Sequence, residues 1–272
     1  MITIKTPEEI ELLRIAGQIV GDTHNYLKSF IKPGITTKEL DQLAEDYILS
    51  RDATASFKNY QGYPGSICTS VNNEVVHGIP SDRVLQDGDI ISIDIGANYK
   101  GYHGDSAWTY AVGTIDKQKE DLMKHTEQAL FLGLATIRDG SRVGDIGNAV
   151  YTYARKHNLG VVRELVGHGV GKNLHEEPDV PNFGKKGTGP ILKEGMVIAV
   201  EPMINAGSHH VYILDDDWTI ITADEKPSAH FEHTVLVTKD GYEILTKRWL
   251  NGKTRHNRST RKGYRCDTWR KI

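Results

Sequence analysis

A chain of 272 residues, of which 38% are hydrophobic and 25% charged, has the composition of an ordinary globular protein and is long enough to bury a sizeable core. The first residues lack the apolar run of a signal peptide, and no later stretch reaches membrane-spanning length. Two cysteines, Cys68 and Cys266, are too few for a disulfide framework and lack the paired spacing of a zinc knuckle. We therefore expect a cytoplasmic protein.

Positive charge is concentrated at the end of the chain. Residues 247–272 contain ten Lys and Arg against one acid, Asp267, although the whole chain has a net charge of −3. We expect one domain over residues 1–246 and a flexible basic tail over 247–272. Two interpretations of this tail stay open, a contact with RNA such as the ribosome surface and a solvated extension without a partner.

Apolar periodicity and capping signals predict four long helices. Thr6-Pro7-Glu8-Glu9 is typical of a capping box with proline at the first helical position, and Thr36 with Glu39 forms a second box. The predicted helices cover residues 7–30, 37–50, 117–136 and 142–156.

Short apolar runs between Gly, Pro and Asp turns predict strands that form antiparallel hairpins. They cover residues 66–71, 89–95, 105–112, 196–201, 210–214, 218–222, 230–237 and 242–245, with a turn around 98–101. Hairpins flanked by long helices indicate an α+β fold rather than a doubly wound parallel sheet.

Two segments repeat each other at an offset of 107 residues. Residues 84–97 read V-L-Q-D-G-D-I-I-S-I-D-I-G-A, and 191–204 read I-L-K-E-G-M-V-I-A-V-E-P-M-I. Asp94 falls on Glu201, each predicted at the end of an apolar strand. A second similarity, 31–40 with 137–146, follows at an offset of 106. One duplication predicts two related halves, with these acids meeting near the axis between them.

Strand alternation indicates where the acids point. Asp94 and Asp105 share their strand faces with small residues, and Glu201 shares its face with Ala199. Glu232 lies within a strand otherwise suited to burial. Carboxylates gathered in one interior would repel each other unless cations compensate. His168, from G-H-G-V-G, would add one imidazole. This ligand set suits Mn, Fe, Co or catalytic Zn better than a structural zinc, and five ligands suffice for two ions.

Seven motifs then point to a known family. They follow one another as V-V-H-G-I-P (75–80), I-S-I-D-I-G (91–96), H-G-D-S-A-W-T (103–109), G-H-G-V-G (167–171), H-E-E-P (175–178), E-P-M-I (201–204) and F-E-H-T (231–234). Together they resemble type I methionine aminopeptidases, of the pita-bread fold shared with prolidases and creatinases. The resemblance covers residues 1–246.

The resemblance implies a dinuclear centre and a reaction. Its metal ligands would be Asp94, Asp105, His168, Glu201 and Glu232, holding two divalent ions. The implied activity is removal of the initiator methionine from nascent polypeptides when the second residue is small and uncharged, by attack of a hydroxide that bridges the ions. Family members are usually monomers.

Catalytic and substrate-binding roles also follow from the resemblance. Glu201 would carry the proton from water to the leaving amine, while His77 and His175 would hold the substrate and polarise the scissile amide. The walls of the methionine pocket would be Tyr60, Tyr63, Cys68, Leu174 and Trp218. Leu174 replaces a Phe that bacterial members often have, which leaves the size of the pocket open.

Two alternatives stay open at this point. One is another peptidase of the same fold, such as an Xaa-Pro dipeptidase or aminopeptidase, although those usually carry an additional N-terminal domain. The other is a non-catalytic relative that binds RNA or protein, although such relatives generally lose metal ligands and this chain keeps all five.

Overall fold

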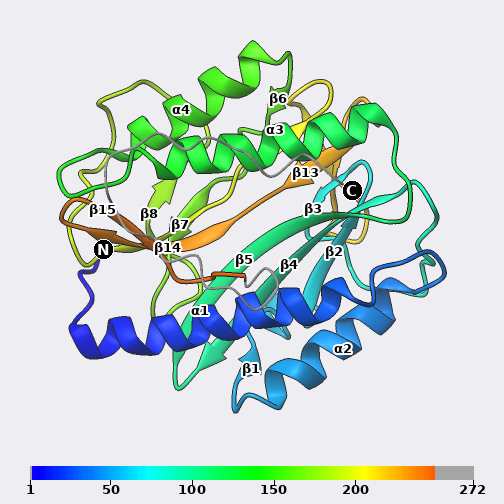
Figure 1. The fold of residues 1–272 in the computed structure, drawn as a ribbon, viewed down its shortest axis with the longest axis horizontal. Coiled ribbons are helices and arrows are strands. Elements are labelled where there is room, and N and C mark those ends of the chain that lie inside the picture. The colour runs from blue at the N-terminus through cyan, green and yellow to red at the C-terminus, as the bar shows by residue number, and fades with distance from the viewer. Residues whose placement is uncertain (1, 249–272) are drawn as a thin grey trace, which may run out of the picture.

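The computed structural model describes residues 2–248 and confirms an α+β fold (Figure 1). Its helices are α1 (Pro7–Lys28), α2 (Thr37–Leu49), α3 (Lys117–Leu134) and α4 (Val143–Lys156), with a short 3-10 turn η1 (Tyr60–Gly62). Its strands are β1 (Thr54–Ala55), β2 (Ile67–Val71), β3 (Glu74–Val76), β4 (Ile90–Tyr99), β5 (Tyr102–Ala111), β6 (Gly160–Val161), β7 (Gly167–Gly169), β8 (Glu176–Val180), β9 (Val197–Val200), β10 (Met203–Asn205), β11 (Val211–Ile213), β12 (Ile220–Thr222), β13 (Ser228–His230), β14 (His233–Thr238) and β15 (Gly241–Ile244).

The strands pair into antiparallel sheets that lie between two pairs of helices. One sheet has the order β1-β4-β2 with β5 on β4, and another has the order β15-β14-β9-β7-β8. Two smaller sheets, β13-β10-β6 and β11-β12-β3, complete the arrangement within residues 2–248. In Figure 1, α1 and α2 lie along one side of the strands and α3 and α4 along the other. The helices begin as predicted, since Thr6 and Thr36 form capping boxes with Glu9 and Glu39.

The predicted duplication is visible in equivalent backbone hydrogen bonds. The amide of Gly34 donates to the carbonyl of Leu85, and the amide of Gly140 donates to that of Leu192. Both glycines adopt a positive φ, 97° and 83°, which an L side chain rarely tolerates. The isolated bridge between Thr36 and Val84 likewise has its counterpart between Arg142 and Ile191. Each half therefore closes its helix pair onto its sheet through the same connection.

Three features differ from the sequence predictions. The predicted turn near 98–101 contracts to Lys100-Gly101, so β4 and β5 form a longer hairpin with ten residues in each strand. The predicted strand over 230–237 is interrupted after His230 and resumes as β14, because Glu232 leaves the ladder to donate its backbone N–H to the carbonyl of Ala107. Strands β1, β3, β6, β7, β8 and β10 are absent from the sequence predictions, since none of them has the long apolar run or alternation that marks the other strands.

The last described residues pack against the helices. The carbonyl oxygens of Leu245 and Lys247 come so close to Gly17 and Gly21 of α1 that neither glycine could carry a methyl group without a shift of the backbone. The Arg248 guanidinium then lies 3.3 Å from the centroid of the Trp108 ring. The first two residues of the predicted tail therefore belong to the packed body, whereas residues 249–272 and Cys266 lie outside the described residues.

Membrane insertion through a helix finds no support in residues 2–248. None of the helices there combines the length and apolar character that a crossing requires.

Substitution of Gly21 by alanine tests this close packing. In an open helix position the exchange would stabilise the fold by about 1 kcal/mol. Here the methyl group would collide with the Lys247 carbonyl oxygen, so we expect a loss of about 1–3 kcal/mol in the free energy of unfolding. Thermal unfolding measures it. Gly241→Ala is the matched control, since a methyl group there meets nothing within 4 Å. A Gly21→Ala protein as stable as its parent contradicts the packing described here.

Candidate active site

The β4–β5 hairpin places Asp94 and Asp105 on one face. Asp94 stands opposite Ala107 and Gly96 stands opposite Asp105, so the two acids are diagonal neighbours. A 2.8 Å hydrogen bond between the hydroxyls of Ser92 and Thr109 identifies the shared face further along the hairpin. The prediction that small residues flank both acids is confirmed. The prediction that Asp94 ends its strand is wrong, because β4 continues to Tyr99.

Glu232 reaches this face from the gap between β13 and β14. Its backbone carbonyl accepts a 2.6 Å hydrogen bond from the Ser106 hydroxyl. Thr234 forms two hydrogen bonds with the backbone of Asp105. Its hydroxyl donates to the Asp105 carbonyl at 2.7 Å and accepts from the Asp105 amide at 3.2 Å. These bonds join β14 to β5 and fix the Glu232 side chain beside Asp105.

His168 and Glu201 come from the second half of the chain. His168 lies in β7, and its Nδ1 donates to the carbonyl of Gly169 at 2.9 Å. Nε2 is therefore the nitrogen with the free lone pair. It lies 3.6 Å from Glu201 Oε1 and 3.8 Å from Asp105 Oδ2. Glu201 directly follows β9, as predicted.

Three of the five predicted ligands form a compact donor group. One ligand atom from each of Asp105, His168 and Glu232 lies within 4.8 Å of the others. Within residues 2–248, the buried oxygens Asp94 Oδ1, Asp105 Oδ1 and Glu232 Oε1 have no hydrogen-bond partner. Orphaned acceptors on buried carboxylates are what a cation would satisfy. The residues present therefore fit one or more divalent ions.

Burial sets the protonation of these acids when no cation compensates them. It raises the pKa of Asp94 to about 6 and the pKa of Glu201 to about 8. The pKa values of Asp105 and Glu232 also rise well above their ordinary range, because burial and the neighbouring carboxylates both disfavour the charged form. A bound dication would reverse this preference.

The predicted histidines lie at the same cavity. A cavity of about 650 Å³ is lined by Asp94, His168 and Glu201 together with His77 and His175. His77 adopts a left-handed φ of 59°, and burial lowers its pKa to about 4. His175 shares a 2.9 Å hydrogen bond with the Tyr60 hydroxyl, and burial lowers its pKa too. Both imidazoles are therefore neutral at pH 7 and can donate a hydrogen bond without carrying charge.

All five residues predicted to form a methionine pocket gather in one apolar cluster. It contains Phe57, Tyr63, Cys68 and Leu174, with Tyr60, Ile79 and Trp218 packed against them. Cys68 pairs with Asp94 across β2 and β4, so the cluster adjoins the acids. Burial raises the pKa of the Cys68 thiol well above its ordinary value, which keeps it neutral and makes it a wall rather than a nucleophile.

Sequence reasoning missed two groups at this site. His230 lines the cavity, with Nε2 3.4 Å from Glu201 Oε2. Its position two residues before Glu232 could have revealed it, since alternate residues share a strand face. For Lys5, no pattern in the sequence indicated a place near the site. It is 8% exposed and donates to Glu176, the residue after His175, so the N-terminal segment supports the cavity wall.

Comparison with known proteins agrees with this geometry. The profile of metallopeptidase family M24 matches residues 11–239. Methionine aminopeptidase 1 of Bacillus subtilis (strain 168) is 56% identical over 247 residues, which cover 91% of this chain and 100% of that protein. The crystal structure of methionine aminopeptidase from Rickettsia prowazekii is 43% identical with a TM-score of 0.90, over 91% of this chain and 100% of that one.

A more distant structure shares the fold of this chain but belongs to a longer protein. The Xaa-Pro dipeptidase from Bacillus anthracis has a TM-score of 0.72 at 27% identity, over 90% of this chain but only 62% of that one. The expected pita-bread fold is therefore confirmed, and so is a hydrolase that acts on N-terminal peptide bonds. By family profile, by sequence identity and by structure, the chain belongs to metallopeptidase family M24.

Proposed function

We propose that this enzyme removes an N-terminal methionine from nascent polypeptides when the second residue is small and uncharged. The observation that carries the proposal is the apolar cluster of Tyr63, Cys68 and Trp218 beside a group of buried acids. An unbranched thioether fits such an aromatic, uncharged pocket. The similarity to proteins named methionine aminopeptidase supports the same substrate.

Two divalent ions are the proposed cofactors, held by Asp94, Asp105, His168, Glu201 and Glu232. When bound, such ions lower the pKa of a coordinated water far enough for it to attack an amide at neutral pH. Mn, Fe, Co and Zn all suit this set of oxygens and one nitrogen.

The side chains around the cavity supply the proton transfers. Glu201 is the proposed general base that takes a proton from water and delivers it to the leaving amine. His175 is proposed to donate to the carbonyl oxygen of the scissile bond, and His77 to hold the substrate amide. Because burial keeps both histidines neutral, neither would repel the cations that the carboxylates hold.

The oligomeric state, location and partners of the enzyme can be proposed as well. We infer a monomer in the cytoplasm that meets its substrates as they leave the ribosome. The ten Lys and Arg of residues 247–272 would favour contact with ribosomal RNA.

A peptide assay tests the substrate. We expect release of methionine from Met-Ala-Ser in the presence of Mn or Co, and none after treatment with a chelator. Ala-Pro-Ser is the comparison that an Xaa-Pro peptidase would cleave. If no methionine is released under Mn, Co, Fe or Zn, the proposal is wrong.

Asp105→Asn tests the metal ligands. The variant should lose bound metal, by elemental analysis, together with activity. Saturating metal at about 100 times Kd stabilises a protein by about 2.7 kcal/mol, or roughly 5–10 °C at this chain length. We expect this shift in the parent and not in the variant. Asp82→Asn is the control, since that side chain is 91% exposed. Unchanged metal content in Asp105→Asn would exclude it as a ligand.

Glu201→Gln tests the protonation of the metal-free site. The unfolded chain releases the Glu201 proton above its ordinary pKa of 4.5, whereas burial keeps that proton on the folded protein up to about pH 8. The folded state thus binds more protons in this window, and its stability falls as pH rises. Glutamine does not titrate. The Tm of the variant should exceed that of the parent by little at pH 5 and by more toward pH 8. A difference in Tm that does not change with pH would contradict the raised pKa of Glu201.

A further inference from the structure

The hairpin of β11 and β12 carries one wall of the apolar cluster at its tip. Trp218 lies in this tip and packs edge-on against two residues of the site. Its ring centroid is 5.1 Å from that of Tyr63 and 6.3 Å from that of His77. Further along the hairpin, Tyr212 and Ile213 are exposed. The tip therefore touches the substrate cluster on one side and is weakly covered elsewhere.

A second cavity, of about 260 Å³, lies behind this wall. Leu214, Asp216 and Thr219 line it from the hairpin, and Thr69 and Ile79 line it from the body of the protein. Ile79 also packs against the apolar cluster, so this side chain borders both the cluster and the second cavity. This volume leaves space beside the tip that no side chain lining the cavity fills.

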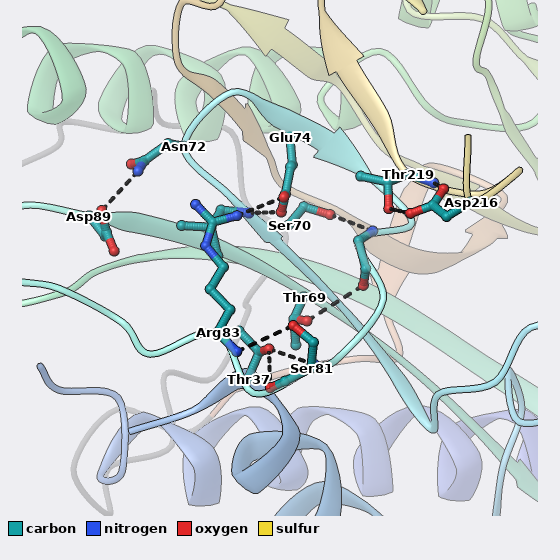
Figure 2. Close-up of polar contacts among 12 residues, drawn as sticks. Thr37, Thr69, Ser70, Asn72, Glu74, Ser81, Arg83, Asp89, Asp216 and Thr219 are labelled. Atoms are coloured by element: carbon teal, nitrogen blue, oxygen red, sulfur yellow. Dashed lines mark hydrogen bonds and ion pairs between the residues drawn. The ribbon is translucent and has the colours of Figure 1, made fainter. Parts of the chain in front are cut away.

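The side of the cavity opposite the hairpin is held by its own hydrogen bonds. Arg83 donates to Glu74 at 2.7 Å, and the Thr37 hydroxyl donates to the carbonyl of Ser81 at 3.0 Å. Figure 2 shows these residues on one side and Asp216 with Thr219 on the other. That side is therefore tied to α2 and β3. The hairpin is joined to β3 only from Ile220 onward, so residues 214–219 of the tip depend more on contacts among themselves.

Asp216 supplies those contacts. Its carboxylate accepts hydrogen bonds from the Thr219 hydroxyl at 2.5 Å, the Thr219 amide at 2.7 Å and the Trp218 amide at 2.9 Å. Burial raises the pKa of Asp216, but these three donors outweigh burial and hold that pKa below its ordinary value. The carboxylate thus fixes the backbone at Trp218 itself.

We propose that Asp216 is a positioning residue that sets the enzyme's selectivity for the N-terminal side chain. By holding Trp218 against Tyr63, it keeps the methionine pocket at one size despite the cavity behind the wall. This inference rests on the proposed function. Without the carboxylate, the tip can move into the second cavity, so the pocket binds methionine less well and accepts branched side chains more readily.

Asp216→Ala is the decisive variant, with Asp215→Ala as its matched control. Both lose one exposed negative charge in adjacent positions, but Asp216 carries the bonds to Trp218 and Thr219. For Met-Ala-Ser we expect Asp216→Ala to lower kcat/KM about tenfold, the equivalent of one lost charge-assisted hydrogen bond, mainly through KM. For Leu-Ala-Ser the loss should be smaller, so the ratio of Met to Leu cleavage falls.

Two further variants separate positioning from damage to the fold. Asp216→Asn keeps an oxygen acceptor favoured in such turns and should restore most of the selectivity. Thr219→Val removes one donor and should shift selectivity in the same direction by less. Metal content should match the parent in all four variants. Thermal unfolding should stay cooperative, with a decrease in Tm of no more than a few degrees where hydrogen bonds to residue 216 are lost.

The outcomes distinguish this inference from the proposed function. If the parent releases no methionine, the proposed function fails and the inference fails with it. If the parent does so, and Asp216→Ala keeps the Met-to-Leu ratio of Asp215→Ala, the inference alone is overturned. A Met-to-Leu ratio that falls only together with metal content would also overturn it, since the metal centre would then be the cause.

Discussion

Four carboxylates, two of them buried and two partly buried, share one site with His168 and His230. The free energy of holding like charges together in a protein interior constrains the rest of the molecule. Two unit charges 4 Å apart repel by about 4 kcal/mol at an effective dielectric constant of 20. Asp94, Asp105 and Glu232 also have oxygens that no neighbour within residues 2–248 satisfies. Protons or cations must therefore complete this site. The long hairpin, the interrupted strand and the small neighbouring residues all maintain that arrangement.

Much of this arrangement could be predicted from the sequence, because the duplication marks it. Asp94 and Glu201 occupy equivalent places in two halves, and equivalent backbone bonds at Gly34 and Gly140 close both halves in the same way. Strand alternation then sufficed to put Asp94 and Asp105 on one face. These predictions succeeded because each depends on a period or a repeat within the chain.

Other features could not be predicted, because they depend on contacts between distant segments. The interruption at Glu232 follows from its bond to Ala107, about 125 residues away in the chain. The buried pair of Lys5 and Glu176 has no local pattern at all. The cavity behind Trp218 is likewise a property of how a hairpin meets the body of the protein.

Neutrality is the common property of the residues that are proposed to bind the substrate. His77, His175 and Cys68 are all kept uncharged by burial, next to a site that is rich in ionisable oxygen. This division lets charge gather where a cation would sit, while an apolar side chain meets uncharged walls. In the proposed function, specificity and metal binding therefore rest on different groups of residues.

The contact of Arg248 with Trp108 has a practical consequence. Trp108 and Asp105 differ by an odd number of positions in β5, so their side chains leave opposite faces of the strand. Arg248 therefore anchors the chain on the face turned away from the acids. A dye or a solid support attached directly to this residue's neighbourhood would therefore start on the face of β5 opposite Asp105, which favours this region for immobilisation.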